Sequence, residues 1–182
     1  MPASDLAIFM KSYFGGMTEI ITKHGGTVDK YIGDSIMAFW GAPHSCENGP
    51  LKAVEAPLEC QHFLYQLNSQ YKAEGKPRLS TRIGIHTGSA LVGNFGYEER
   101  LNYTAFGDNV NIASRLEGSN KFYGTNILVS EETYNAVQHS LAGRFIDQVT
   151  VKGKQKATKL YEIIAPKGQI PDDAKQFLQL YA

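Results

Sequence analysis

A lysine and an aspartate stand four residues apart in residues 27–41, which read TVDKYIGDSIMAFWG. Two short apolar runs flank Gly33-Asp34, so the segment predicts a β-hairpin with the Asp34 carboxylate at its tip. Such a carboxylate can hold Mg²⁺, and a lysine placed rigidly on a strand, here Lys30, can contact a base edge or a phosphate. Taken alone, the pattern fits a turn aspartate and a solvated strand lysine equally well.

A second segment, residues 100–117, reads RLNYTAFGDNVNIASRLE. Its first part alternates like a strand, and from Asp108 onward the apolar residues follow helical spacing (Val110, Ala113 and Leu116). We therefore expect a strand that leads into a helix, with Asp108 as its N-cap. Asn111 and Arg115 are four residues apart and should share one helix face, where an amide and a guanidinium suit a phosphate. A solvated polar face is the alternative interpretation.

Two further motifs accompany these segments: HTG at 86–88 with VGNFG at 92–96, and VKGK at 151–154. In order and spacing, the four motifs closely resemble the class III nucleotidyl cyclase catalytic domain, from about Leu6 to Ile164. The resemblance implies an α+β, ferredoxin-like fold with an antiparallel-rich central sheet flanked by helices. It implies a catalytic domain over residues 1–165 and a linker with a short helix over residues 166–182. His86 is interpreted as structural rather than catalytic.

The resemblance also assigns roles to single residues. It implies that Asp34 is the second of two aspartates that hold Mg²⁺ or Mn²⁺, and that Arg115 stabilises the transition-state phosphate. It also implies that Asn111 orients the ribose and that Lys152 binds the terminal phosphates. Lys30 and Thr104 match the pair that reads the purine. The implied reaction is attack of the 3′-oxygen on the α-phosphorus with loss of pyrophosphate, which depends on positioning and on neutralising phosphate charge.

The choice of base follows from the hydrogen-bonding groups of this last pair. Adenine offers N1 as an acceptor and its 6-amino group as a donor. The Lys30 ammonium can only donate, so it satisfies N1, while the Thr104 hydroxyl can accept from the amine. Guanine presents the reverse pattern, which leaves polar groups unpaired at a cost of about 1–3 kcal/mol each. The expected substrate is therefore ATP.

The resemblance implies an adenylate cyclase that converts ATP to 3′,5′-cyclic AMP and pyrophosphate in intracellular signal transduction. Domains of this family pair head to tail, and the metal aspartates come from one protomer while the purine, ribose and arginine groups come from the other. Both sets occur on this chain, which suits a homodimer with two shared sites. The alternative is a non-catalytic module of cyclase type that binds nucleotide, regulates and dimerises.

One element of the family pattern is not found. The first metal aspartate of the family lies in a strand before the first helix, in a pattern like Asp-x-x-Gly-Phe-Thr. This sequence begins MPASDL, and Asp5 stands in helix-capping surroundings. Three explanations remain open: the chain is truncated, a partner segment supplies the strand, or the domain no longer catalyses.

The composition is that of a globular domain of 182 residues, with 42% apolar residues and 18 basic against 18 acidic side chains. This balance gives no electrostatic case for binding nucleic acid or an anionic membrane. Cys46 and Cys60 show no metal-like spacing, and no apolar run approaches the roughly 20 residues that span a bilayer. We expect no membrane contact by this chain and a cytoplasmic location, either alone or as the cytoplasmic domain of a larger membrane-anchored protein.

The remaining elements are predicted from periodicity and turn residues. The first helix starts near Leu6 and is stopped by Gly25-Gly26, and a second helix covers roughly residues 48–73, with an uncertain start because Pro57 lies within it. Two strands at 79–87 and 89–95 are expected to be joined by a glycine-bearing turn. Further elements are a strand at 126–129, a helix from about Glu131, strands at 145–151 and 160–164, and a helix at 174–181.

Overall fold

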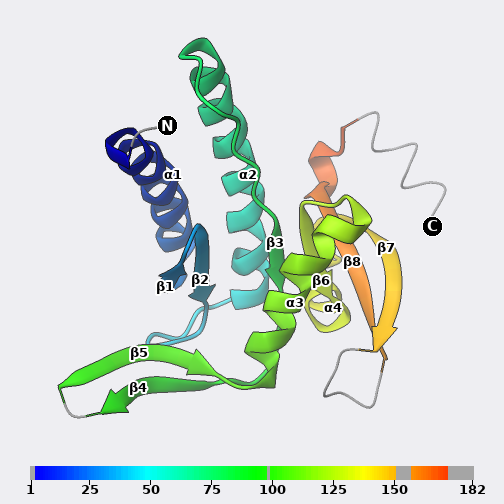
Figure 1. Ribbon diagram of the computed structural model, residues 1–182. Helices are drawn as coiled ribbons and strands as arrows, with labels where there is room; N and C mark the ends of the chain where they lie inside the picture. Colours follow the sequence, from blue (N-terminus) through cyan, green and yellow to red (C-terminus); the bar gives the residue numbers. More distant parts are fainter. Residues whose placement is uncertain (1–2, 98, 151–156, 172–182) are drawn as a thin grey trace. The chain divides into compact units, whose positions relative to one another are not determined.

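The computed structural model describes residues 3–97, 99–150 and 157–171 and divides into two compact units, with the boundary between Thr81 and Arg82 (Figure 1). The first unit contains α1 (Ala3–Lys23), β1 (Thr27–Ile32), β2 (Ser35–Phe39) and α2 (Gly49–Ala73). The second contains β3 (Ile83–Ile85), β4 (Leu91–Tyr97), β5 (Arg100–Phe106), α3 (Asp108–Tyr123), β6 (Ile127–Ser130), α4 (Glu131–Val137), β7 (Leu141–Thr150), β8 (Ala157–Pro166) and the short 3-10 helix Lys167–Gln169.

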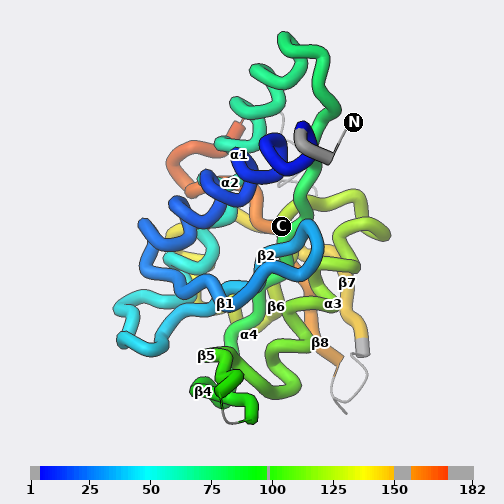
Figure 2. Tube along the Cα trace, turned by 60° about the vertical axis from the view of Figure 1, so that its left-hand side comes forward, coloured from blue at the N-terminus to red at the C-terminus, as the bar shows by residue number. Residues whose placement is uncertain are grey.

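In the first unit, α1 packs against both α2 and the β1–β2 hairpin (Figure 2). Its buried side chains recur at helical spacing: Phe9, Tyr13, Met17, Ile20 and Ile21. The Phe9 ring stacks on Tyr71 of α2 with 4.6 Å between centroids, and the Tyr71 hydroxyl donates to the Phe9 carbonyl at 3.1 Å. On the hairpin side, the ring of Phe14 lies 4.7 Å from that of Tyr31. These contacts attach the hairpin to the helix layer.

The β1–β2 hairpin confirms the turn predicted at Gly33-Asp34. The strands are antiparallel, Ile32 pairs with Ser35, and the two residues between them form the turn. Gly33 has φ 63°, the left-handed value that a two-residue turn needs at its first central position and that glycine adopts at little cost. Asp34 is consequently exposed at the tip.

The predicted strand at 79–87 is shorter than expected, since only Ile83–Ile85 form β3. The residues just before it are hydrogen-bonded by side chains instead of by a neighbouring strand. The Asn68 side chain bonds both the N–H and the carbonyl of Leu79 at 2.8 Å, and the Gln61 amide donates to the Thr81 carbonyl at 2.8 Å. Because these side chains occupy the backbone groups, this stretch lies extended along α2 without joining a sheet.

The second unit is built on a four-stranded sheet with the order β3-β6-β8-β7. β3 is parallel to β6, whereas β6–β8 and β7–β8 are antiparallel. The α3 backbone lies directly on β3 at Gly84, where an added Cβ would stand 2.1 Å from the Glu117 nitrogen. Beneath the helix, apolar side chains from α3, β6 and β8 form a buried cluster: Ile112, Leu116, Leu128 and Leu160.

The strands expected at 79–87 and 89–95 are both present in part, but they do not pair with each other. β4 pairs with β5, with Leu91 opposite Phe106 and Tyr97 opposite Arg100, while β3 pairs with β6. The β4–β5 ribbon projects from the rest of this unit (Figure 1). Four large apolar side chains on it are at least half exposed: Leu91, Tyr97, Leu101 and Phe106.

The start of α3 also differs from the prediction by one residue. Gly107, not Asp108, is the N-cap, and its φ of 134° is a conformation that favours glycine. Asp108 instead occupies the first turn, where a carboxylate is favourable to the helix dipole. α2 continues through Pro57 and begins at Gly49, close to the expected start.

Within the described residues, helices and mainly antiparallel strand pairs give the α+β class that the sequence predicts. The expected helix at 174–181 and the VKGK motif with Lys152 lie outside the described residues. Among the helices that the structure describes, none is both long and apolar enough to cross a bilayer.

Candidate functional site

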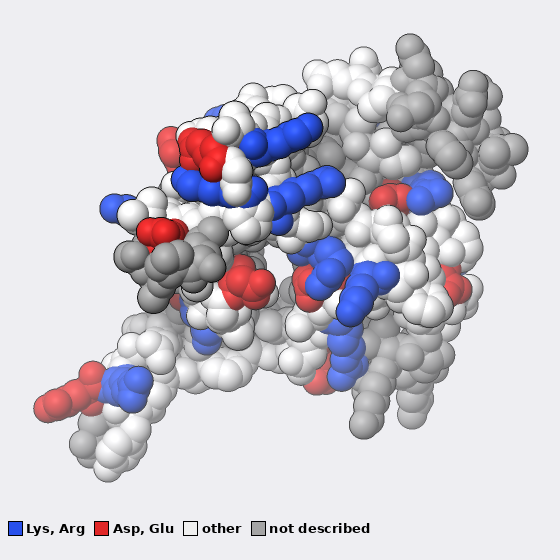
Figure 3. Space-filling view, turned by 45° about the horizontal axis from the view of Figure 1, so that its top comes forward, with Lys and Arg blue, Asp and Glu red and all other residues white. Residues whose placement is uncertain are grey.

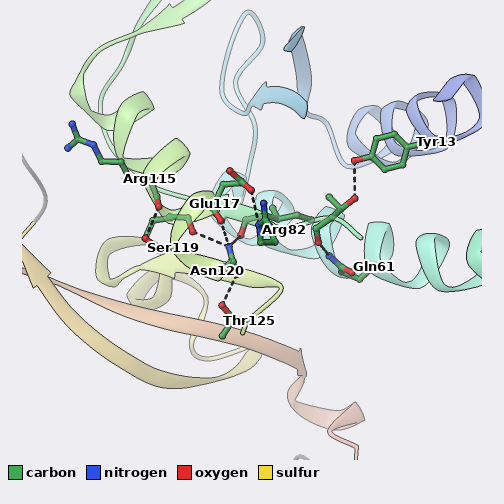
Figure 4. Close-up of polar contacts among 11 residues, drawn as sticks. Tyr13, Gln61, Arg82, Arg115, Glu117, Ser119, Asn120 and Thr125 are labelled. Carbon is green, nitrogen blue, oxygen red and sulfur yellow. Dashed lines mark hydrogen bonds and ion pairs between the residues drawn. The ribbon is translucent and has the colours of Figure 1, made fainter. Parts of the chain in front are cut away.

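Helix α3 presents Asn111 and Arg115 on one exposed face, as their spacing predicts. The opposite side of the helix is buried at positions four residues apart, Ile112, Leu116 and Asn120. In Figure 4 the Arg115 guanidinium points away from Asn120 and from the residues bonded to it. The helix is therefore held by one side, and its other side offers an amide and a guanidinium that can contact phosphate and sugar oxygens.

A buried amide attaches α3 to the sheet. The Asn120 side chain is fully buried, and its Nδ2 donates to the carbonyls of Ile83 at 3.0 Å, Leu116 at 3.0 Å and Glu117 at 3.2 Å (Figure 4). Its Oδ1 accepts from the Thr125 hydroxyl at 2.8 Å. At the surface, Arg82 at the start of the unit forms an ion pair with Glu117 at 3.2 Å. These bonds tie α3 to the first residue of β3, to the residue before that strand and to the turn after the helix.

His86 supports the other end of α3. Its side chain is 1% exposed, Nδ1 lies 2.7 Å from the Ser130 hydroxyl, and Nε2 lies 2.9 Å from Asn109 Oδ1. The Asn109 amide nitrogen donates to the Ser89 carbonyl at 2.8 Å, so Oδ1 is an acceptor and Nε2 must carry the proton. The His86 imidazole is thus buried and hydrogen-bonded through both ring nitrogens, which supports its structural interpretation.

Thr104 lies on β5 and is 2% exposed. It pairs with Gly93 of β4. Phe106, two residues along the strand, lies on the same face, and its ring meets that of Phe95 edge-on with 4.7 Å between centroids. The Thr104 hydroxyl therefore sits on an aromatic face of the β4–β5 ribbon, where water does not compete strongly for its hydrogen bonds.

Lys30 and Asp34 belong to the hairpin of the first unit. The Lys30 side chain is 43% exposed, and its ammonium lies 3.3 Å from the carboxylate of Asp29, which is itself 1% exposed. Asp29 is not among the site residues predicted from the sequence. The available signal was a charged pair, Asp29-Lys30, between the apolar Val28 and the aromatic Tyr31. Asp34 also acts on its surroundings: the pKa of Tyr13 is raised, first by burial and further by the Asp34 charge.

The structure thus places Asn111 and Arg115 together on α3, Thr104 on the strand just before that helix, and Lys30 with Asp34 in one hairpin. Lys152 lies outside the described residues. On the face shown in Figure 3, basic and acidic side chains both occur among uncharged surface, as the zero net charge suggests.

The side chains present bear on the proposed metal site. In the part of the chain that the structure describes, no three His, Cys, Asp or Glu side chains form a group that could hold a metal ion. Mg²⁺, however, is commonly held by one or two carboxylates together with substrate phosphates rather than by a complete protein cage. The exposed Asp34 carboxylate fits the role of one such ligand.

Comparison with known proteins shows the family of the chain. Residues 2–165 match the sequence profile of the adenylate and guanylate cyclase catalytic domain. The chain belongs to this family. The cyclase domain is 38% identical over 160 residues to adenylate cyclase 1 of Rhizobium meliloti (strain 1021), a match that covers 88% of the chain and 24% of that protein. The predicted family and the predicted cyclase fold are thereby confirmed.

Two solved structures show the same fold. The adenylyl cyclase CyaB from P. aeruginosa superposes with a TM-score of 0.84 at 31% identity, covering 94% of this chain and 88% of that one. The guanylyl cyclase Cya2 superposes with a TM-score of 0.79 at 33% identity, covering 91% and 83%. Because both kinds of cyclase are similar to this domain to a comparable degree, the substrate has to be argued from single residues. The domain spans about a quarter of the length of its curated relative from Rhizobium meliloti.

Proposed function

We propose that this cyclase domain converts ATP to 3′,5′-cyclic AMP and pyrophosphate in intracellular signal transduction. The observation that carries the proposal is the exposed Asn111–Arg115 face of α3, which is held rigidly from behind by Leu116 and Asn120. In the reaction the ribose 3′-oxygen attacks the α-phosphorus, and pyrophosphate leaves. Asn111 orients the ribose, and the Arg115 guanidinium stabilises the charge that develops on the phosphate.

Adenine is the base that Lys30 and Thr104 fit. The lysine ammonium donates to adenine N1, and the threonine hydroxyl accepts from the 6-amino group. Guanine would set its N1–H against the ammonium, which has no acceptor. Because Thr104 is buried, an unmatched partner there should cost about 1–3 kcal/mol, enough to separate the two nucleotides. Lys152 is proposed to bind the terminal phosphates.

Mg²⁺, or Mn²⁺ in its place, is the proposed metal, with Asp34 as its protein ligand and the nucleotide phosphates as further ligands. When bound, the metal neutralises phosphate charge. Asp34 itself has the exposed position that a ligand of an incoming metal–nucleotide complex requires.

We propose that the domain acts as a head-to-tail homodimer. The apolar side chains exposed on the β4–β5 ribbon, Leu91, Tyr97, Leu101 and Phe106, support a contact with a second copy, because a partner would cover apolar surface that now faces water. In the proposed dimer each site takes Asp34 from one protomer and Arg115 from the other. We also propose that residues 1–165 form the catalytic domain, that residues 166–182 form a linker and helix, and that the domain works in the cytoplasm.

The test is the rate of cyclic AMP formation from ATP, with Mg²⁺ and with Mn²⁺, by the wild-type chain and by Arg115→Ala. We expect the variant to lose at least about a hundredfold in rate, as when a group that stabilises transition-state charge is removed. Lys121→Ala, on the same helix but in its last turn, is the matched control and should keep the wild-type rate. Equal rates for wild type and Arg115→Ala would contradict the proposal. A wild-type chain that binds ATP but forms no product with either metal would favour the regulatory module.

A further inference from the structure

The strand that carries Lys30 is irregular at the residue before it. In the β1–β2 ladder Val28 pairs with Ala38, whereas Lys30 pairs with Met37, the next residue on the partner strand. Asp29 is therefore an extra residue in β1, which makes a β-bulge. Bulges of this kind turn a side chain away from its regular direction and are frequent beside active sites.

The bulge explains how two neighbouring side chains meet. In a regular strand, successive residues point to opposite faces, so the side chains of Asp29 and Lys30 would diverge. Instead the Lys30 ammonium lies 3.3 Å from Asp29 Oδ1. The irregular backbone thus brings a carboxylate and an ammonium to the same side of the hairpin.

The two partners differ in burial. The Asp29 side chain is 1% exposed, and the Lys30 side chain is 43% exposed. A buried carboxylate is costly unless its charge is compensated, so the ammonium is held toward the buried oxygen. The carboxylate cannot move outward with its partner, because it is enclosed. One end of the pair is therefore fixed, and the other faces solvent and any ligand.

We propose that Asp29 is a positioning residue that aims the Lys30 ammonium for recognition of the adenine N1. This inference rests on the proposed reading of the base by Lys30. An ammonium carries three N–H donors, so an ion pair with one carboxylate does not exhaust its capacity to donate to a ligand. A free lysine side chain samples many rotamers, and the ion pair removes much of that freedom before the nucleotide arrives. Asp29 sets where the donor stands and does not itself touch the base.

The experiment measures the Kd of ATP and of GTP by displacement of a fluorescent ATP analogue, for wild type, Asp29→Asn, Lys30→Met and the double variant. Asp29→Asn keeps the shape and removes the charge. It should lower the preference for ATP over GTP about fivefold, the change expected when one ordinary hydrogen bond is weakened. In the Lys30→Met background, Asp29→Asn should change the preference for ATP over GTP by less than about twofold, because the two residues act through one contact. Glu74→Gln removes the Glu74–Lys76 ion pair in the same unit and should leave the preference unchanged.

A purely structural role for Asp29 gives a different result. In that case Asp29→Asn would lower the thermal unfolding midpoint, or weaken the binding of ATP and of GTP equally, and the ratio of the two Kd values would not change. An unchanged ratio would overturn the inference. If Lys30→Met keeps the full preference for ATP, the proposed base reading is wrong and the inference fails with it. If Asp29→Asn does not fold, Asp29→Glu serves instead: it keeps the charge but displaces the ammonium by about one methylene, and an unchanged preference would again overturn the inference.

Discussion

Replacing the buried Asn120 with leucine should destabilise the domain strongly. The substitution keeps a similar shape but removes every polar bond of the side chain. The Leu116 and Glu117 carbonyls lie within the helix, so the main losses are at the Ile83 carbonyl and at the Thr125 hydroxyl, which is 3% exposed. Each buried polar group left without its partner costs about 1–3 kcal/mol, and the added apolar burial offsets part of this. We expect a net loss of about 2–4 kcal/mol.

The assay is urea unfolding followed by far-ultraviolet circular dichroism, with the m-value compared between variants. For a chain of this length the loss corresponds to a fall of roughly 4–16 °C in thermal midpoint. Ser119→Ala is the matched control. The Ser119 hydroxyl donates to the Arg115 carbonyl at 2.8 Å but is exposed, so its removal should change the free energy of unfolding by no more than about 0.5 kcal/mol. If Asn120→Leu is as stable as Ser119→Ala, the bonds to β3 do not hold α3 in place.

Two further predictions concern base choice and pH. Lys30→Glu combined with Thr104→Cys should weaken the use of ATP and admit GTP, because the donor facing N1 becomes an acceptor. Steady-state kinetics with both nucleotides measure this change. An unchanged preference for ATP would show that the purine roles are misassigned. The Tyr123 hydroxyl donates to Asp147 at 2.6 Å, and this hydrogen bond, followed by one from the Gln148 backbone, lowers the pKa of Asp147 below its ordinary 3.8. The stability from this bond is therefore present above about pH 4 and is lost as pH falls through the lowered pKa, so the difference in urea midpoint between wild type and Tyr123→Phe should shrink in acid. A difference that stays constant down to pH 2 would contradict the coupling.

Local turn chemistry accounts for what the sequence predicted well. Gly33-Asp34 makes a hairpin because glycine reaches the left-handed conformation that the turn needs. The shared face of Asn111 and Arg115 follows from helical spacing alone. The family was recognisable because four motifs stood in register, and none of them depends on the details of packing.

Strand pairing could not be predicted in the same way, because it depends on residues far apart in the chain. The extended stretch before β3 bonds to Asn68 and Gln61 of α2, and β3 itself pairs with β6 more than forty residues later. The bulge at Asp29 is similar, since it is a property of how β1 registers against β2. Asp108 was displaced from the cap by one residue because Gly107 can adopt a backbone conformation that an aspartate avoids.

The most direct test of the account is to mix two inactive chains, Asp34→Ala and Arg115→Ala, and to measure cyclic AMP formation from ATP. If each site takes Asp34 from one protomer and Arg115 from the other, a heterodimer contains one site with both defects and one with neither. Random exchange makes about half of the dimers heterodimers, so activity should recover to roughly a quarter of the wild-type level, while each variant alone stays inactive. A mixture that stays inactive, while light scattering and subunit exchange show that heterodimers form, would contradict a site shared between two chains.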